Sequence, residues 1–490
     1  MVHGSFHPLV PSCIAILLLG CLDESVVAPR PRAPLLVEVL SQPNPRNSLS
    51  AVIFITAQNA DSARVLYTEP TAGQAATPFY AVRQGSVSIP LLGLKPHSTY
   101  LYTVEAFGPG GRGSSSELTL STSGLPVELS GLRMVQLAGA PSPGFLLTAF
   151  LLDSIGAVVA FDTLGEVCWY REFPLRPNEQ TIDAQQNANG DFTVFVGAST
   201  GWQPTSGRFI RFSPAGDSLG SLVAGAPYYT DPHEILFSNS DAGGERVHLF
   251  SYDLRHVDLS AIGGASDVLL AGHTILRQAP DGSVEFLWSA WDHISLDDWI
   301  LKPANFSQVT NTDFDHPNSL DIDPNGDYIV SFANLWEIMK IDGVTGRTVW
   351  RLGGKNNQFG IVGDPLGGFS VQHDVRLLPN GHLLVYDNGY SHTPPQSRAV
   401  EYALDLGAMT ATMVWEYRHN PSIFTPYVGS VQRYSNGTTL VGFGGGVARV
   451  TEVAPSGDVL WEGEATRGGQ PLNFFYRMRK TLSLYKAERP

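Results

Sequence analysis

Short apolar runs separated by turn residues fill most of this chain. The clearest example lies in residues 369–398, where two apolar runs flank an Asn380-Gly381 pair. An Asn-Gly turn between two such runs is a strong signal for a β-hairpin. His373 stands where the first run begins, so we expect a strand that carries a histidine near its start.

The same layout occurs twice more, in residues 231–252 around His233 and in residues 315–334 around His316. Three alike histidines in three alike units ask for a common explanation. A repeat fold whose inner strands face one axis would bring them together. Together they could bind a metal, act as acid, base and nucleophile, or be hydrogen-bonded channel residues. No HxH or HExxH pair is present to form a metal site in advance, and we expect none.

From residue 127 onward the chain reads as six units, each with a glycine turn and most with a late tryptophan. Each unit has three or four short strands and could not bury both its faces alone. A ring of stacked blades solves this, so residues 127–480 are predicted to form a six-bladed β-propeller. The segment from Phe474 is expected to complete the last blade or to lie against it. The late tryptophans should pack between blades; they are Trp169, Trp288, Trp350, Trp415 and Trp461.

Residues 34–123 have short alternating strands that resemble a fibronectin type III module. The positions that match its Leu-x-Pro-x-Thr-x-Tyr-x-Tyr corner are Leu94, Pro96, Thr99, Tyr100 and Tyr102. The interval therefore predicts one Ig/fibronectin III-like β-sandwich. Its expected role is that of a spacer or of a surface for a homodimer.

The first 21 residues have the pattern of a signal peptide. An apolar core at positions 14–20 is too short to span a bilayer, and it ends at Cys21 in a sequence that resembles a lipobox. Cys21 is therefore predicted to be acylated, with an ordinary cleaved signal as the alternative. A proline-rich linker, residues 22–33, follows. The protein is expected to be exported and held in the cell envelope by a lipid anchor.

Composition narrows the classes of partner. The chain has 50 Gly, 34 Pro and 16% charged residues, as expected of a turn-rich β protein. It has 46 acidic and 31 basic residues, a formal net charge of −15, so a nucleic-acid partner is not expected. Three cysteines provide no disulfide framework, and stability must come from sheet packing.

One region resembles a known family. Residues 231–417 contain DHPNSLDID, GDYIVSFANLWEIMKID, TGRTVWRLGG, QHDVRLLPNGHLLVYDNG and VWEYRH. These motifs resemble the bacterial arylsulfate sulfotransferases. The resemblance implies a six-bladed propeller with a smaller N-terminal β domain and ping-pong transfer of a sulfuryl group from a phenolic sulfate ester to a phenol. It implies no cofactor. It also implies that His373 is the nucleophile and that His233 and His316 surround the sulfate.

These residue types suit sulfuryl transfer. The reaction needs a nucleophilic nitrogen, donors aimed at the nonbridging oxygens, and a group that protonates the leaving phenolate. Asn318 and Asn388 stand beside the histidines and could orient an imidazole or bind a sulfate oxygen. Tyr386, Tyr390 and His392 could line an aromatic pocket or belong to its rim.

Ala333 is a departure from the family pattern, because it occupies the position of an expected catalytic arginine. Loss of a fixed cation that faces an oxyanion should cost about 2–4 kcal/mol. Arg376 or Arg398 could replace it, or the substrate could carry a different group. Alternatively, the chain has lost catalysis and binds a sulfated or phenolic ligand, or a partner protein, at the same mouth.

Two competing signals are weaker. The motif KIDGVTG with Trp350 resembles the repeat of quinone-dependent dehydrogenase propellers, but it occurs once. The acidic residues of positions 321–327 resemble a calcium loop, but Phe332 stands where the loop needs a glutamate. We expect a hairpin turn there.

Overall fold

The computed structural model describes residues 31–69, 73–198, 207–239 and 244–486. The predicted signal peptide, Cys21 and most of the predicted linker lie outside these residues. Across the described part of the chain, no helix is both long and apolar enough to cross a membrane. The protein is all-β, and the helices of the described residues are single short turns. Four of them lie between residues 290 and 335: α1 (Ala290–His293), η3 (Leu296–Asp298), η4 (Phe306–Gln308) and η5 (Ala333–Leu335).

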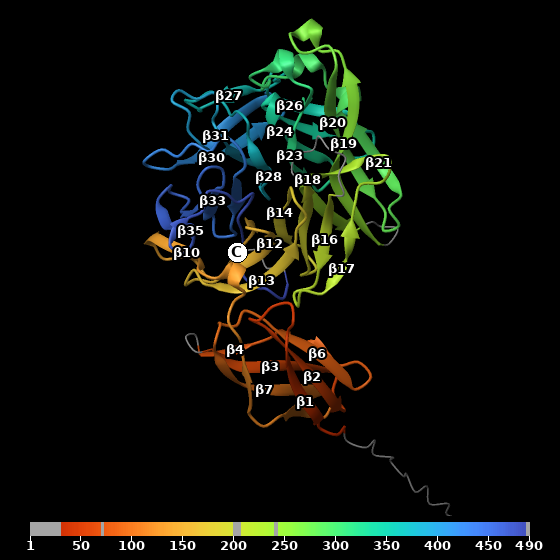
Figure 1. Cartoon of the computed structure of the whole chain (residues 1–490), viewed down its shortest axis with the longest axis vertical. Helices are drawn as coiled ribbons and strands as arrows, with labels where there is room; N and C mark the ends of the chain where they lie inside the picture. Colours follow the sequence, from red (N-terminus) through yellow and green to blue (C-terminus); the bar gives the residue numbers. More distant parts are fainter. Residues whose placement is uncertain (1–30, 70–72, 199–206, 240–243, 487–490) are drawn as a thin grey trace, which may run out of the picture.

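The N-terminal part forms two sheets around one core (Figure 1). One sheet has the order β1 (Leu35–Pro43), β2 (Ala51–Gln58), β6 (Ser86–Leu91). The other contains β4 (Gly73–Ala76), β3 (Ser62–Glu69), β7 (Thr99–Gly108) and β8 (Gly111–Ser114), with β5 (Tyr80–Ala81) and β9 (Leu118–Ser121) beside β3 and β7. The hydroxyl of Tyr100 accepts a hydrogen bond from the backbone N–H of Lys95 at 2.6 Å, the arrangement known as a tyrosine corner.

Six further sheets follow in the described chain after residue 127. The first sheet contains β11 (Phe145–Leu152), β12 (Ile155–Phe161) and β13 (Val167–Pro174), and the second contains β14 (Glu179–Gln186), β15 (Phe192–Ala198), β16 (Arg208–Phe212) and β17 (Ser218–Leu222). The third contains β18 (Tyr229–Asn239), β19 (Glu245–Val257), β20 (Val268–Gln278), β21 (Val284–Ser289) and β22 (Asn311–Asp313). The fourth contains β23 (Pro317–Ile322), β24 (Tyr328–Phe332), β25 (Glu337–Ile341) and β26 (Thr348–Gly353). The last two contain β27 (Gly360–Val362), β28 (His373–Leu377), β29 (Leu383–Asp387), β30 (Arg398–Asp405) and β31 (Thr410–Arg418); and β32 (Ser430–Arg433), β33 (Thr439–Phe443), β34 (Arg449–Val453), β35 (Val459–Arg467) and β36 (Gln470–Pro471).

Strands from the two ends of this region complete each other's sheets. β10 (Leu132–Gly139) pairs with β35, and β37 (Arg479–Thr481) pairs with β11. The C-terminal segment was expected to complete the last unit or to lie against it. It does not complete that unit, because β37 joins the first unit and β10 joins the last, but it does lie against it, since β37 contacts β32 and Met478 N donates to Ser430 Oγ at 3.0 Å. The exchange covers edges that would otherwise offer unpaired backbone groups.

The first strands of the six sheets, from β11 through β14, β18, β23 and β28 to β32, contact one another in that order, and β32 contacts β37. Figure 1 shows the labels of β14, β18, β23 and β28 near the middle of the larger body and those of β17 and β21 nearer its rim. Residues at the starts of different sheets can therefore meet.

Tryptophans fill the spaces between neighbouring sheets. Trp169 stacks on Phe192 and Phe212 of the next sheet, with ring centroids 4.7 and 6.1 Å apart. Trp288, Trp350 and Trp461 are also at most 5% exposed. Their predicted place in the core is confirmed. Trp415 is only partly buried. The guanidinium of Arg433 covers its ring, 4.8 Å from the ring centroid of Trp415.

The predicted hairpins are present. β28 and β29 are joined by a turn in which Gly381 has φ 83° and donates to Leu378 O at 2.9 Å. β23 and β24 are joined in the same way through Gly326. In that turn Lys340 Nζ lies 2.7 Å from Asp323 and 3.1 Å from Asp327, so the carboxylates of the suspected calcium loop already share a cation.

Candidate functional site

The strands that carry the three histidines are irregular at the same place. The register shifts between Thr230 and Ile235 in β18, between Pro317 and Ser319 in β23, and between His373 and Arg376 in β28. Such bulges re-aim side chains.

Left-handed backbone accompanies the bulges. His316 has φ 48°, Asp374 φ 50° and Val428 φ 53°. A non-glycine residue in this conformation costs about 1–3 kcal/mol of folding free energy, and such strained residues cluster at functional sites. The local irregularity therefore marks the level of the histidines as a candidate site.

The structure brings the three histidines together. The rings of His233 and His316 meet edge to face with centroids 4.8 Å apart. His373 is close enough for positive charge on His316 and His233 to lower its pKa. The side chain of His316 is 31% exposed and that of His233 is 11% exposed, while His373 is buried.

His373 is held as a neutral ring with one defined tautomer. Its Nδ1 lies 2.8 Å from Asn388 Oδ1 and 2.9 Å from Val371 O, both acceptors, so Nδ1 carries the proton. The amide of Asn388 cannot be flipped, because its Nδ2 donates to Thr425 O at 2.7 Å and to Val428 O at 2.9 Å. Burial, together with His316, lowers the pKa of His373 to about 3. Nε2 therefore keeps its lone pair and accepts only a long bond, 3.3 Å, from Val428 N.

The surroundings of His316 favour its protonated form more than water does. Its Nδ1 forms a hydrogen bond with Oδ2 of Asp313. The other oxygen of that carboxylate, Oδ1, accepts a hydrogen bond from Asn334 Nδ2 at 2.8 Å. Burial by itself favours the neutral ring, but the Asp313 carboxylate outweighs it and the pKa of His316 is raised.

His233 differs, although it also has a carboxylate partner. Its Nδ1 lies 2.9 Å from Asp231 Oδ1, which leaves Nε2 for the site. Burial lowers the pKa of His233, and Asp231 offsets this only in part. The environments thus push the pKa values of His233 and His316 in opposite directions, as expected of groups with separate acid and base roles.

A fourth histidine, His273, lies behind this group. Its Nδ1 bonds Asp315 Oδ1 at 2.6 Å, and its Nε2 lies 3.4 Å from Asp231 Oδ2. Sequence reasoning missed it because it stands in the middle of β20 rather than at the start of a hairpin. Sequence reasoning also missed the partner carboxylates, although the local patterns Asp-x-His at 231–233 and Asp-x-Asp-His at 313–316 could have revealed them.

Asn318 holds the backbone next to His373. Its Nδ2 donates to the carbonyl of Gln372, the residue before His373, at 2.7 Å. Gln372 in turn donates to Ser331 Oγ at 3.1 Å on the neighbouring sheet. Asn318 and Asn388 therefore both support His373, one through the backbone and one through the ring.

Arg398 belongs to a buried ion network. It is 0% exposed and binds Asp364, Asp387 and Glu416 at 2.8 to 3.0 Å. Its five N–H groups are engaged there, and it forms no hydrogen bond to the three histidines. Substrate binding by Arg398 is therefore not supported by its position.

Arg376 is also committed elsewhere, to Glu234 at 2.7 Å and Asp374 at 2.6 Å. Ala333 donates its N–H to His316 O at 2.9 Å, so the position of the expected arginine does lie beside the histidines. Neither candidate arginine occupies that place.

The residues that follow His233 and His373 point into a charged centre, which sequence reasoning also missed. Arg477, 3% exposed, lies 2.6 Å from Asp183, 3.1 Å from Glu234 and 3.4 Å from Asp374. Arg479 binds Asp374 as well. Arg477 and Arg479 of the C-terminal segment therefore hold together the strands that carry His233 and His373. These arginines lie far from the two histidines in sequence, so no local pattern reveals the contact.

Of the suspected aromatic pocket, only Tyr390 remains available. Tyr386 is buried with its hydroxyl 2.5 Å from Thr425 Oγ1, and His392 is buried against Asp387 at 2.8 Å. Tyr390 is 48% exposed and contacts the ring of Phe424 at 6.2 Å. These two aromatic side chains could contact an aryl group.

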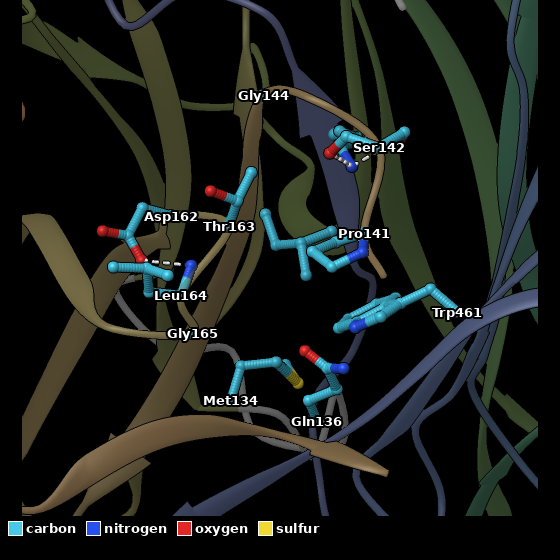
Figure 2. A pocket seen from close by; sticks show the side chains of 12 residues that line it. Met134, Gln136, Pro141, Ser142, Gly144, Asp162, Thr163, Leu164, Gly165 and Trp461 are labelled. Atoms are coloured by element: carbon cyan, nitrogen blue, oxygen red, sulfur yellow. Dashed lines mark hydrogen bonds between the residues drawn. The ribbon is translucent and has the colours of Figure 1, made fainter. Parts of the chain in front are cut away.

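A small cavity lies away from the histidines, at the seam between β10, β12 and β35 (Figure 2). Met134, Gln136, Pro141 and Trp461 line it, and its volume is about 20 Å³. That is room for about one water molecule, not for an aromatic ring. Within the described residues no cluster of His, Cys, Asp and Glu has the arrangement of a metal site.

Comparison with known proteins gives one family. Residues 224–467 match the family model described as "Arylsulfotransferase (ASST)". No curated protein matches the chain.

Several solved structures match with low identity. One is a protein of unknown function from Bacteroides caccae, with 14% identity, coverage of 69% of this chain and 99% of that one, and a TM-score of 0.41. Another is a catalytically inactive virginiamycin B lyase from Staphylococcus aureus with quinupristin, with 8% identity, coverage of 67% and 87%, and a TM-score of 0.33. A putative 6-phosphogluconolactonase from Bacteroides fragilis has 11% identity, coverage of 86% and 99%, and a TM-score of 0.33.

Proposed function

Because the chain belongs to the arylsulfotransferase family through residues 224–467, we propose that it moves a sulfuryl group from a phenolic sulfate ester to a phenol by a ping-pong mechanism. The intermediate is a sulfohistidine at His373. The observation that carries this proposal is the fixed Nδ1–H tautomer of His373, which leaves a neutral, unprotonated Nε2.

We propose that residues 127–480 form a six-bladed propeller, which the order of contacts among the first strands supports, and that residues 34–123 are an Ig/fibronectin III-like sandwich. We also propose that the protein is exported and anchored to a membrane through acylated Cys21, after cleavage of residues 1–20. The sandwich then acts as a spacer or as the surface of a homodimer.

In the first half-reaction, the lone pair of His373 Nε2 attacks sulfur and the bond from sulfur to the aryl oxygen breaks. The ring becomes positively charged, and its Nδ1–H donates to Asn388 Oδ1 and Val371 O, which stabilise that charge. The phenolate leaves with the electron pair and takes the Nε2 proton of the His316 imidazolium.

In the second half-reaction, neutral His316 accepts the proton of the incoming phenol. The phenol oxygen attacks sulfur, the bond from sulfur to nitrogen breaks, and the electron pair returns to Nε2 of His373. The lowered pKa of His233 favours its neutral ring with the proton on Nδ1, so its Nε2 faces the site as an acceptor. The N–H of Val428, 3.3 Å from Nε2 of His373, is a donor beside the reacting atom.

In this scheme, the charge of the missing arginine comes from His316. Asp313 favours the imidazolium, and the ring is the most exposed of the three. An imidazolium presents one N–H to the substrate where a guanidinium presents two in a fixed fork. We therefore propose a slower enzyme than an arginine-containing relative.

Ala333 also favours a second candidate, in which the chain binds a sulfated or phenolic ligand, or a partner protein, without turnover. The two candidates share the site and differ in whether His373 becomes sulfated.

The test uses purified protein without its first 30 residues, para-nitrophenyl sulfate and a phenol acceptor. His373→Ala should abolish release of nitrophenol, and His382→Ala, in the same hairpin but bound to Glu401, should leave it unchanged. Ala333→Arg should raise the rate. No nitrophenol release from the parent, together with release from Ala333→Arg, would establish the binding candidate instead.

A further inference from the structure

His273 is a buried histidine enclosed by two carboxylates. It is 1% exposed, with Nδ1 2.6 Å from Asp315 Oδ1 and Nε2 3.4 Å from Asp231 Oδ2. Its backbone N–H also donates to Asp315 Oδ2 at 3.0 Å. The ring of Tyr252 covers it at 4.7 Å. Both ring nitrogens therefore face an acceptor, which is the arrangement that an imidazolium requires.

The same two carboxylates also hold the proposed catalytic histidines. Asp231 accepts from the ring Nδ1 of His233 and from its backbone N–H, each at 2.9 Å. Asp315 accepts from the backbone N–H of His316 at 3.0 Å and so supports its left-handed backbone. His273 thus pairs with the carboxylate that holds the ring of His233 and with the carboxylate that holds the backbone of His316.

Charge explains why a cation is needed behind them. Asp231 and Asp315 are both 0% exposed, and a buried carboxylate without a compensating charge takes up a proton. The pKa of His273 supports the cationic form, because the two carboxylates outweigh burial and raise it to about 10. Burial raises the pKa of Asp231, but His233 and, to a smaller extent, His273 outweigh it and hold that pKa low.

We propose that His273 is a positioning residue: as a fixed imidazolium between Asp231 and Asp315, it keeps Asp231 ionised and holds Asp315 in place, so that they orient the ring of His233 and the backbone of His316. This inference rests on the proposed function for its catalytic consequence, but the orientation of His233 can be measured without turnover. Hydrogen bonds join His273 to Asp315 and Asp315 to the backbone of His316, and an ion-pair contact at 3.4 Å joins His273 to Asp231, the partner of His233.

The test replaces His273 by glutamine, which removes the charge and keeps one donor. The matched control is His256→Gln, because His256 also pairs with an aspartate, Asp267 at 2.7 Å, but is 71% exposed in its side chain. We expect nitrophenol release by His273→Gln to fall at least tenfold at neutral pH. The acid limb of its kcat/KM profile should lie at higher pH than in the parent and in His256→Gln, as Asp231 becomes protonated.

A purely structural role would lower the rate by one factor at every pH, and that result would overturn the proposal. If His273→Gln does not fold, Asp315→Asn with His273→Gln removes one carboxylate together with the cation. Asp231 still lacks its cation in this double variant, so the acid limb should again lie at higher pH than in the parent.

Histidine ring NMR separates this inference from the proposed function. In the parent, His233 should keep its proton on Nδ1, and in His273→Gln it should become a mixture of tautomers. An inert parent would refute the proposed function alone. An unchanged His233 tautomer in His273→Gln would refute the role of His273, whatever the activity.

Discussion

Asn388 should control how readily His373 becomes sulfated. The side chain is buried, and its Oδ1 is one of two acceptors for the Nδ1–H of His373, at 2.8 Å. The ring gains positive charge as Nε2 bonds to sulfur, so this hydrogen bond becomes charge-assisted in the transition state. Asn388→Ala removes it and leaves only the carbonyl of Val371 at 2.9 Å.

The size of the effect follows from the change in charge. A hydrogen bond to a charged group contributes about 1.5–3 kcal/mol, and about 1.4 kcal/mol corresponds to tenfold in rate. Sulfation of His373 should therefore slow about 10- to 150-fold in Asn388→Ala. The variant should also lose stability, because the carbonyls of Thr425 and Val428 lose their donor, at about 1–3 kcal/mol each.

The assay is the burst of nitrophenolate released on rapid mixing with para-nitrophenyl sulfate in the absence of an acceptor phenol. Asn380→Ala is the control, since Asn380 also contacts a histidine, His382 at 3.1 Å, but on the exposed turn of the same hairpin. Its burst rate should equal that of the parent. An unchanged burst rate in folded Asn388→Ala would refute the assignment of the tautomer and of Nε2 as the nucleophile.

Three further changes test other parts of the account. Asp313→Asn removes the carboxylate that raises the pKa of His316, so His316 should lose its proton at lower pH. For esters with poor leaving groups, the alkaline limb of the burst rate should therefore move to lower pH. An unmoved limb would exclude His316 as the acid. Arg477→Met leaves three buried carboxylates without the cation that they share. In denaturant titrations it should lower the free energy of unfolding by about 3–5 kcal/mol, whereas the control Arg255→Met, at a side chain that is 48% exposed, should change it little. Equal effects of the two variants would contradict the role of Arg477 in holding the two histidine strands together. Gly429→Ala places a Cβ 2.2 Å from a buried tyrosine ring at φ 109°, so the melting temperature should fall, and retention of the parent's value would show that this strand start can shift.

Local signals predicted the parts of the fold that are local. The Gly381 turn and the apolar runs beside it predicted a hairpin, because a hairpin depends on residues near in sequence. The late Trp169 predicted a contact between consecutive sheets, because so large an apolar ring is buried wherever its strand packs. The pairing of β10 with β35 and of β37 with β11 joins the two ends of a long chain, and no short pattern encodes it.

The same distinction applies to the site. The motif repeated around His233, His316 and His373 predicted their common position, which the bulged strands provide. His273 was not predicted, because its partner Asp315 is 42 residues away in sequence and its importance comes from burial. Arg398 was predicted as one of two arginines that could replace the missing one, but three carboxylates surround it in the folded chain.

The most direct test of the central claim is to locate the sulfuryl group on the protein. The parent is mixed with an aryl sulfate and no acceptor, quenched in alkali to preserve the bond from nitrogen to sulfur, and digested for mass spectrometry. The account predicts one sulfuryl group, on the peptide that contains His373, which disappears when a phenol is added before the quench. A sulfuryl group on His233 or His316, or nitrophenol release with no labelled histidine, would contradict it.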